Sequence, residues 1–180
     1  NGPLLEYVTL REYLKPNVKK ILWFYFEGND LRSLKDRFSN KIISKYVSDL
    51  TFKQDLKNKQ DIINIMTDEL TKDQFNKNIE INEKKLKHDF FKILKLYNLR
   101  TLLDSQQEPE LIPEFKMIIE LANDLAIKNN SKLYFIYLPD YSRYKNKFKF
   151  DNYFKIKAMM TDLDIPFIDI DKEVFKKEEN

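Results

Sequence analysis

The sequence has 180 residues, which is enough for about one domain with a buried core. Its hydrophobic share of 42% and aromatic share of 14% exclude a disordered chain, although 34% of the residues are charged. The 32 basic and 29 acidic residues give a net charge of +3 and are interleaved along the chain. Interleaved charges are typical of a solvated surface, so no nucleic-acid partner is expected.

The sequence contains no cysteine, which excludes disulfides, thiolate metal sites and thiol nucleophiles but identifies no compartment. Its only glycines are Gly2 and Gly28, so there is no glycine-rich phosphate loop, and neither a cofactor nor a metal is expected. No apolar run approaches the ~20 residues of a membrane span, and no signal peptide is visible. Because the chain opens on Asn1 without an initiator methionine, we expect a fragment, and its localisation is not predicted.

The first predicted elements are a helix and a strand. Pro3 suits the first turn of a helix, whose partial apolar face is formed by Leu4, Leu5, Tyr7, Val8 and Leu14. Pro16 and Asn17 end this helix. Residues 21–26 are an uninterrupted apolar run that stops at Glu27, which predicts a strand buried on both faces, as in parallel sheets.

A long helical insert is predicted over residues 31–112, between this strand and the next. Its predicted parts are a short helix capped by Ser39 and Asn40, a charged helix over 53–71, an exposed loop over 72–82 and a second charged helix over 83–103. A parallel crossover needs only about a dozen residues, so this connection has room for the additional helices.

The rest of the chain alternates helices and strands. A helix is predicted after Pro113, with an apolar stripe over 115–126, and Asn129 and Asn130 close it. A strand over 133–138, a basic and aromatic loop over 141–149, a helix over 152–163 and a strand over 165–170 are predicted to follow. Alternation of this kind predicts an α/β fold with a parallel sheet and helical layers.

Polar residues stand where the first strand ends. Glu27, Gly28, Asn29 and Asp30 form its C-terminal edge, which is where open α/β sheets place their chemistry. Gly2 stands just before a helix, whose first backbone N–H groups favour an anion. Two turns of this kind at neighbouring strand ends predict an anion-binding edge.

Three stretches, residues 1–6 (NGPLLE), 23–31 (WFYFEGNDL) and 133–139 (LYFIYLP), resemble the SGNH/GDSL-type hydrolases, in particular bacterial members. The resemblance covers essentially the whole chain apart from the helical insert. It implies a three-layer αβα sandwich with a flavodoxin-like parallel sheet. It also implies hydrolysis of esters, often of acyl groups on carbohydrates, although some relatives transfer the acyl group instead.

The resemblance assigns catalytic roles to three residues. Asn29 matches the oxyanion asparagine of the Gly-x-Asn-Asp block, with Gly28 in the variable place and Glu27 where the family has its glycine. Gly2 resembles the end of the block that supplies the oxyanion glycine. The Gly-Asp-Ser and Asp-x-x-His blocks are absent, and the single histidine, His88, is expected on the surface of a Lys-rich helix. The chain alone is therefore expected to be inactive, as an internal fragment of a serine ester hydrolase.

The residues themselves leave alternatives. Asn29 either donates to an oxyanion or forms an Asx-type turn with Asp30, which is also a candidate substrate contact. Glu27 either binds substrate hydroxyls or braces the turn. The loop after the second strand either lines the mouth of the site or is simply exposed, and its candidates are Asp140, Tyr141, Arg143 and Tyr144. Asp169 is expected to cap the turn that follows it.

The expected partner is a small-molecule or carbohydrate ester, and the expected activity is that of an esterase or carbohydrate deacylase. An O-acyltransferase on the same fold and a non-catalytic interaction domain are the alternatives. Transfer of the acyl group to a sugar acceptor, and not only to water, would distinguish the transferase from the hydrolase. The sequence does not indicate an oligomeric state.

Overall fold

The structure is a computed structural model that describes residues 2–71, 110–140, 144 and 152–174. The chain divides into two compact units, one formed by Asn1–Gln54 with Glu108–Asn180 and the other by Asp55–Gln107. The described part of the second unit is the 3-10 helix η1 (Leu56–Lys59) and the helical residues 60–71. The loop predicted over 72–82 and the helix predicted over 83–103 lie outside the described residues.

The first unit contains a parallel sheet, which confirms the predicted α/β class. Its strands are β1 (Lys20–Phe26), β2 (Lys132–Leu138) and β3 (Phe167–Asp169), in the order β1-β2-β3. The register places Phe24 of β1 beside Ile136 of β2, and Ile136 beside Ile168 of β3. The carboxyl ends of the three strands therefore meet at one edge of the sheet.

The third strand is shorter than the predicted span of 165–170. It begins after Pro166, which has no backbone N–H to donate to a ladder. It ends at Asp169, because this residue is already the N-cap of the short helix α9 (Ile170–Glu173). Both limits are set by single residues at the ends of the apolar run.

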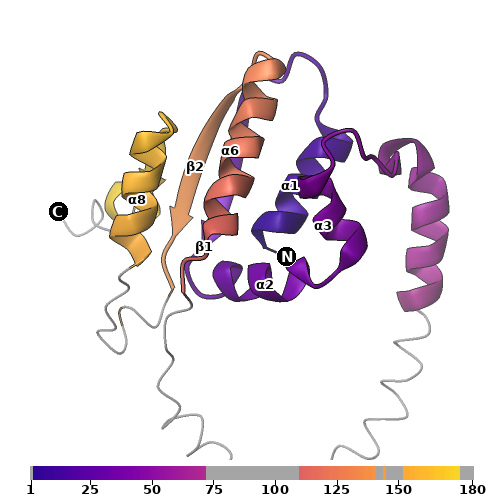
Figure 1. Cartoon of the computed structure of the whole chain (residues 1–180), viewed down its shortest axis with the longest axis horizontal. Helices are drawn as coiled ribbons and strands as arrows, with labels where there is room; N and C mark the ends of the chain where they lie inside the picture. The colour runs from indigo at the N-terminus through magenta and orange to yellow at the C-terminus, as the bar shows by residue number, and fades with distance from the viewer. Residues whose placement is uncertain (1, 72–109, 141–143, 145–151, 175–180) are drawn as a thin grey trace, which may run out of the picture. The chain divides into compact units, whose positions relative to one another are not determined.

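Helices cover one face of this sheet. Helix α6 (Pro113–Lys128) lies over β1 and β2, with α1 (Pro3–Tyr13) and α8 (Asn152–Asp162) on either side of it (Figure 1). All three helices contribute to one buried cluster with the sheet, whose members include Leu4, Tyr7, Trp23, Tyr25, Phe115, Ile118, Ala122, Phe135, Tyr137, Tyr153 and Ile156. Tyr25 packs on Phe115 and Phe135 with ring centroids 5.6 Å from each. This aromatic layer holds α6 against the strands.

The prediction that β1 is buried on both faces is wrong for the described structure. Trp23 and Tyr25 are buried, but Leu22, Phe24 and Phe26 are 53%, 50% and 37% exposed. Successive side chains of a strand point to opposite faces, and the helices α1, α6 and α8 pack on the face of Trp23 and Tyr25. The other face of β1 therefore carries large apolar side chains that no described helix covers.

Two short helices follow β1 directly and belong to the first unit. Helix α2 (Asp30–Phe38) has no counterpart in the sequence prediction, whereas α3 (Lys41–Ser48) is the helix expected after Asn40. The Asn40 side chain accepts hydrogen bonds from Ile42 N at 3.0 Å and Ile43 N at 3.2 Å, as an N-cap does. Both helices pack on α1, so residues 31–54 belong with the sheet-bearing unit.

Arg11 fastens the end of α3 and the following turn to α1. Its guanidinium donates to the carbonyl oxygens of Tyr46 and Asp49, and to those of Leu50 at 2.7 Å and Phe52 at 2.8 Å. The neighbouring Glu12 is buried and accepts hydrogen bonds from the Tyr46 hydroxyl and, at 2.7 Å, from Gln54 N. Two adjacent side chains of α1 thus hold the last residues before the second unit.

Candidate functional site

The turn between β1 and α2 is formed by Glu27, Gly28 and Asn29. Glu27 N donates to Leu138 O at 3.0 Å, so the pairing of β1 with β2 continues one residue beyond Phe26. Helix α2 then begins at Asp30, whose Oδ2 accepts a hydrogen bond from Phe26 N at 2.6 Å. The chain therefore passes from strand to helix within three residues, at the carboxyl edge of the sheet.

Glu27 lies beneath this turn. Its side chain is only 4% exposed, and its two carboxylate oxygens accept hydrogen bonds from the Tyr137 hydroxyl and, at 3.0 Å, from Asp140 N. The carboxylate therefore joins the end of β1 to the end of β2. This arrangement favours bracing of the turn over contact with substrate hydroxyls, the two roles that the sequence left open.

Asn29 stands on the outer side of the same turn. It is exposed and is the N-cap residue of α2, yet its side chain makes no capping hydrogen bond. Its backbone carbonyl accepts the first helical hydrogen bond, from Ser33 N at 2.9 Å. The Asn29 amide is thus not used by the local turn, while the first backbone N–H groups of α2 lie beside it.

The two glycines allow close approaches around this turn. A Cβ on Gly28 would lie 2.2 Å from Asp140 Oδ2 and 2.6 Å from the Phe26 ring. Gly2 has a φ of 133°, and a Cβ there would lie 2.8 Å from the Cβ of Ser33 in α2. Gly2 therefore packs against the start of α2, while Gly28 and Asn29 lie in the turn that precedes this helix. Gly2 is the N-cap of α1 and does not stand at the end of a described strand, unlike the expectation from the sequence.

Two acids near the start of α2, Glu6 and Asp30, have raised pKa values. Burial, and secondarily the charge of Asp30, raises the pKa of Glu6 from 4.5 to about 8. Burial also raises the pKa of Asp30, while the hydrogen bond from Phe26 N opposes that rise. Glu6 was not among the predicted site residues. The available signal was an acid inside the apolar run of α1, between Leu5 and Tyr7.

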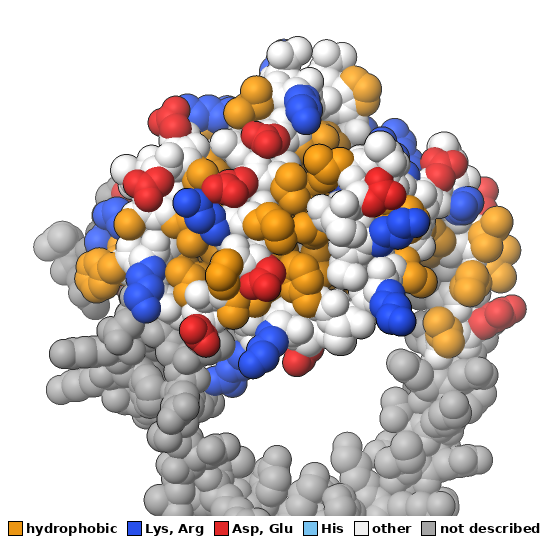
Figure 2. All heavy atoms as spheres, viewed as in Figure 1, with side chains coloured by type: hydrophobic (Ala, Val, Ile, Leu, Met, Phe, Trp, Pro, Cys, Tyr) orange, Lys and Arg blue, Asp and Glu red, His pale blue; other side chains and the backbone are white. Residues whose placement is uncertain are grey.

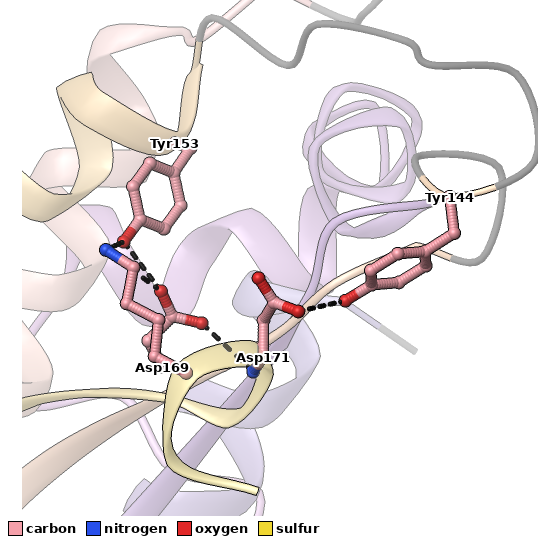
Figure 3. Close-up of polar contacts among 5 residues, drawn as sticks. Tyr144, Tyr153, Asp169 and Asp171 are labelled. Carbon is pink, nitrogen blue, oxygen red and sulfur yellow. Dashed lines mark hydrogen bonds and ion pairs between the residues drawn. The ribbon is translucent and has the colours of Figure 1, made fainter. Parts of the chain in front are cut away.

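A second polar cluster lies at the end of β3 (Figure 3). The Tyr153 hydroxyl donates to Asp169 Oδ2 at 2.6 Å and accepts from Lys172 Nζ at 3.1 Å. Asp169 Oδ1 accepts from Asp171 N at 3.1 Å, so the predicted cap at Asp169 is confirmed. The Tyr144 hydroxyl donates to Asp171 Oδ1 at 2.6 Å. These bonds fix α9 against α8 and the end of the sheet.

The remaining predicted site residues are only partly described. Asp140 is half-buried and donates its backbone N–H to Glu27, which places it at the base of the turn. Tyr141, Arg143 and His88 lie outside the described residues. Asp30 is 5% exposed and bonded to Phe26 N, which favours a structural role for its side chain over contact with substrate.

The described surface offers few other sites for chemistry. No group of three or more His, Cys, Asp or Glu side chains in the described ranges is placed to hold a metal ion. On the face in view in Figure 2, basic and acidic side chains are interspersed, with apolar side chains between them. None of the helices in these ranges is long and apolar enough to cross a membrane.

Comparison with protein-family models, with curated proteins and with solved structures finds no match to this chain. The site must therefore be interpreted from its own geometry. The site consists of the exposed Asn29 carboxamide and the N-terminus of α2. Both lie at a turn that the buried carboxylates of Glu27 and Asp30 hold in place through hydrogen bonds.

Proposed function

We propose that this chain supplies part of the oxyanion site of a serine ester hydrolase of the SGNH/GDSL type. The observation that supports this most is the state of Asn29: its amide is exposed at the first turn of α2 and makes no capping hydrogen bond. An asparagine used only as a cap would bond the N–H groups of its own helix. The amide is instead available to a group that approaches from outside.

In the proposed reaction, a serine Oγ attacks the carbonyl carbon of an ester while a histidine accepts the hydroxyl proton, and negative charge develops on the carbonyl oxygen as its π bond to carbon opens. The Asn29 Nδ2 donates a hydrogen bond to that oxygen, together with backbone N–H groups near Gly2. The positive end of the α2 dipole acts in the same direction. One such donor typically stabilises the transition state by about 3 kcal/mol.

The buried carboxylates of Glu27 and Asp30 contribute to the proposed reaction by holding the turn that carries Asn29 in place. A donor is effective only if it is already aimed at the oxyanion before the reaction begins. Glu27 ties the turn to β2 through Tyr137 and Asp140, and Asp30 ties α2 back to Phe26. We assign these two acids to holding Asn29 in place, and Gly28 to permitting the tight packing of Asp140 against the turn.

In the proposed enzyme the nucleophile and the base come from outside these 180 residues, because the sequence contains no Gly-Asp-Ser and no Asp-x-x-His. The proposed fold is a three-layer αβα sandwich with a flavodoxin-like sheet. The uncovered face of β1, with Leu22, Phe24 and Phe26 exposed, supports a further helical layer on that side.

The test is an assay of the complete protein on p-nitrophenyl acetate and on an O-acetylated sugar, with released acetate measured by titration. Release of acetate into water is the expected result. Transfer of the acetyl group to an added sugar acceptor, in preference to water, would show that the protein is an O-acyltransferase and not a hydrolase. Absence of both reactions from a folded complete protein would contradict the proposal and favour an interaction domain.

A further inference from the structure

The helical residues 60–71 of the second unit carry an exposed apolar stripe. Its side chains recur three or four positions apart, which places them on one side of the helix. Each of them is between 56% and 62% exposed: Ile62, Ile65, Met66 and Leu70. A helix this short is only marginally stable in water by itself, and most helices in proteins depend on the packing of an apolar face. The stripe therefore needs a packing partner.

The charges of the same helical residues restrict what that partner can be. Their charged side chains are Asp61, Asp68 and Glu69, with no lysine or arginine among them. At about 100° of rotation per residue, these three acids lie together along one flank of the stripe. A segment that packs on the stripe fits best if it is both amphipathic and basic.

Residues 83–103 of the same chain meet both requirements in their sequence. Six basic residues stand there against two acidic ones. Four of the apolar residues recur at helical spacing: Leu86, Phe90, Ile93 and Tyr97. The compact unit Asp55–Gln107 contains this segment as well as the acidic helix. The connection over 72–82 exceeds the about 2–8 residues that usually join neighbouring helices, so it is long enough for the chain to turn back.

We propose that residues 83–103 form a helix that packs antiparallel on the apolar stripe of residues 60–71. The second unit is then a helical hairpin with one acidic and one basic helix. If the chain reverses at about residue 78, Leu70 lies beside Leu86 and Met66 lies beside Phe90, so the two apolar stripes meet along their length.

The same chain is a better source of this partner than a second copy or another protein. A short tether keeps the segment at an effective concentration in the millimolar range, far above that of a separate molecule in dilute solution. The stripe is therefore the core of the hairpin and not a binding surface for another protein.

The experiment uses the 180-residue chain, which contains no cysteine, with the paired substitutions Met66→Cys and Phe90→Cys. A disulfide requires the two Cα atoms to approach within about 7 Å. With oxidised glutathione at pH 8, a disulfide within one chain is expected to form at least about tenfold faster than in a control pair. Mass spectrometry of tryptic peptides and non-reducing electrophoresis measure its formation.

The control combines Asn64→Cys with Phe90→Cys. Asn64 is exposed and lies on the side of the helix opposite the stripe, while the length of chain between the two thiols is nearly the same. If circular dichroism shows that Met66→Cys lowers the helix content, the pair Leu70→Cys with Leu86→Cys tests the same register at another position.

Two results would overturn the proposal. Equal rates of disulfide formation in the stripe pairs and the control pair would show that residues 83–103 do not cover the stripe. Disulfides that form mainly between chains, with a yield that rises with protein concentration, would assign the stripe to a second copy.

Discussion

Folding changes the ionisation of Glu6 more clearly than that of the other described residues. Its pKa rises from 4.5 to about 8 on folding, so the folded chain holds a proton that the unfolded chain releases between those values. The favourable contribution of neutral Glu6 is complete below pH 4.5 and is lost as the pH rises through about 8. Stability should therefore fall by a few kcal/mol across this range, since one pKa unit corresponds to about 1.4 kcal/mol.

Glu6→Gln tests this account, because the amide cannot ionise. Urea unfolding at pH 5 and pH 8.5 should show a smaller loss of unfolding free energy for the variant than for the parent chain. Glu69→Gln, at an exposed position of the helical residues 60–71, is the matched control and should retain the parent slope. The same slope in all three chains would contradict the assignment of a buried neutral carboxyl to Glu6.

The two glycines of the site should differ in their tolerance of a methyl group. Gly2→Ala meets both an unfavourable φ of 133° and a Cβ of α2 at 2.8 Å, so it should destabilise the fold by about 1–3 kcal/mol. Gly28→Ala meets only the far ends of the Asp140 and Phe26 side chains, which can move, so its cost should be below about 1 kcal/mol. Thermal unfolding of both variants measures the difference, and the reverse order would show that the turn at Gly28 is the more rigid.

At the scale of elements, Arg11 determines how α3 meets α1. Arg11→Met keeps most of the aliphatic stem but removes the donors to the carbonyl oxygens of Tyr46, Leu50 and Phe52. Unfolding free energy should fall by about 2–4 kcal/mol. Limited proteolysis should then cut first within residues 49–54. Arg37→Met, at an exposed position of α2, is the control, and an equal loss in both variants would deny Arg11 this role.

The elements also show how far local sequence predicts this structure. Continuous apolar runs identified β1 and β2 to within one residue, and Pro113 and Asn129 gave the limits of α6. Helix α2 was missed, because its nine residues bury only Leu31 and Leu34 as apolar contacts. The position of α2 depends on the hydrogen bond between Asp30 and Phe26 and on packing against α1. Neither contact is visible in the hydrophobic periodicity of the sequence.

The candidate site, too, was only partly predictable from local sequence. The place of Asn29 at a strand end was predictable, because the apolar run stops at Glu27. The role of Glu27 was not, since its partners Tyr137 and Asp140 come from the other strand, more than a hundred residues later. Likewise, the exposure of Phe24 depends on which helices cover the sheet and not on the composition of β1.

At the scale of the whole molecule, the described part of the first unit is a sheet with helices on one face, while no described element covers the other face of β1 or pairs with its outer edge. Monomeric proteins rarely expose a contiguous patch of large apolar side chains. The exposed apolar side chains of β1 are therefore better explained as a packing surface for a further element than as ordinary solvent-facing residues. Under the proposed function, the complete protein should hydrolyse esters, whereas the 180-residue chain, which contains no Gly-Asp-Ser and no Asp-x-x-His, should not.

The oxyanion role of Asn29 is tested by the turnover of the complete protein with Asn29→Ala, measured on p-nitrophenyl acetate beside the unfolding free energy of the same sample. If Asn29 donates to the oxyanion, kcat should fall by about 100-fold to 1,000-fold. Unfolding free energy should hold within about 0.5 kcal/mol, because the Asn29 amide is exposed and caps nothing. Asn64→Ala, at an exposed position of residues 60–71, should leave both quantities unchanged. An unchanged kcat for Asn29→Ala would contradict the oxyanion role.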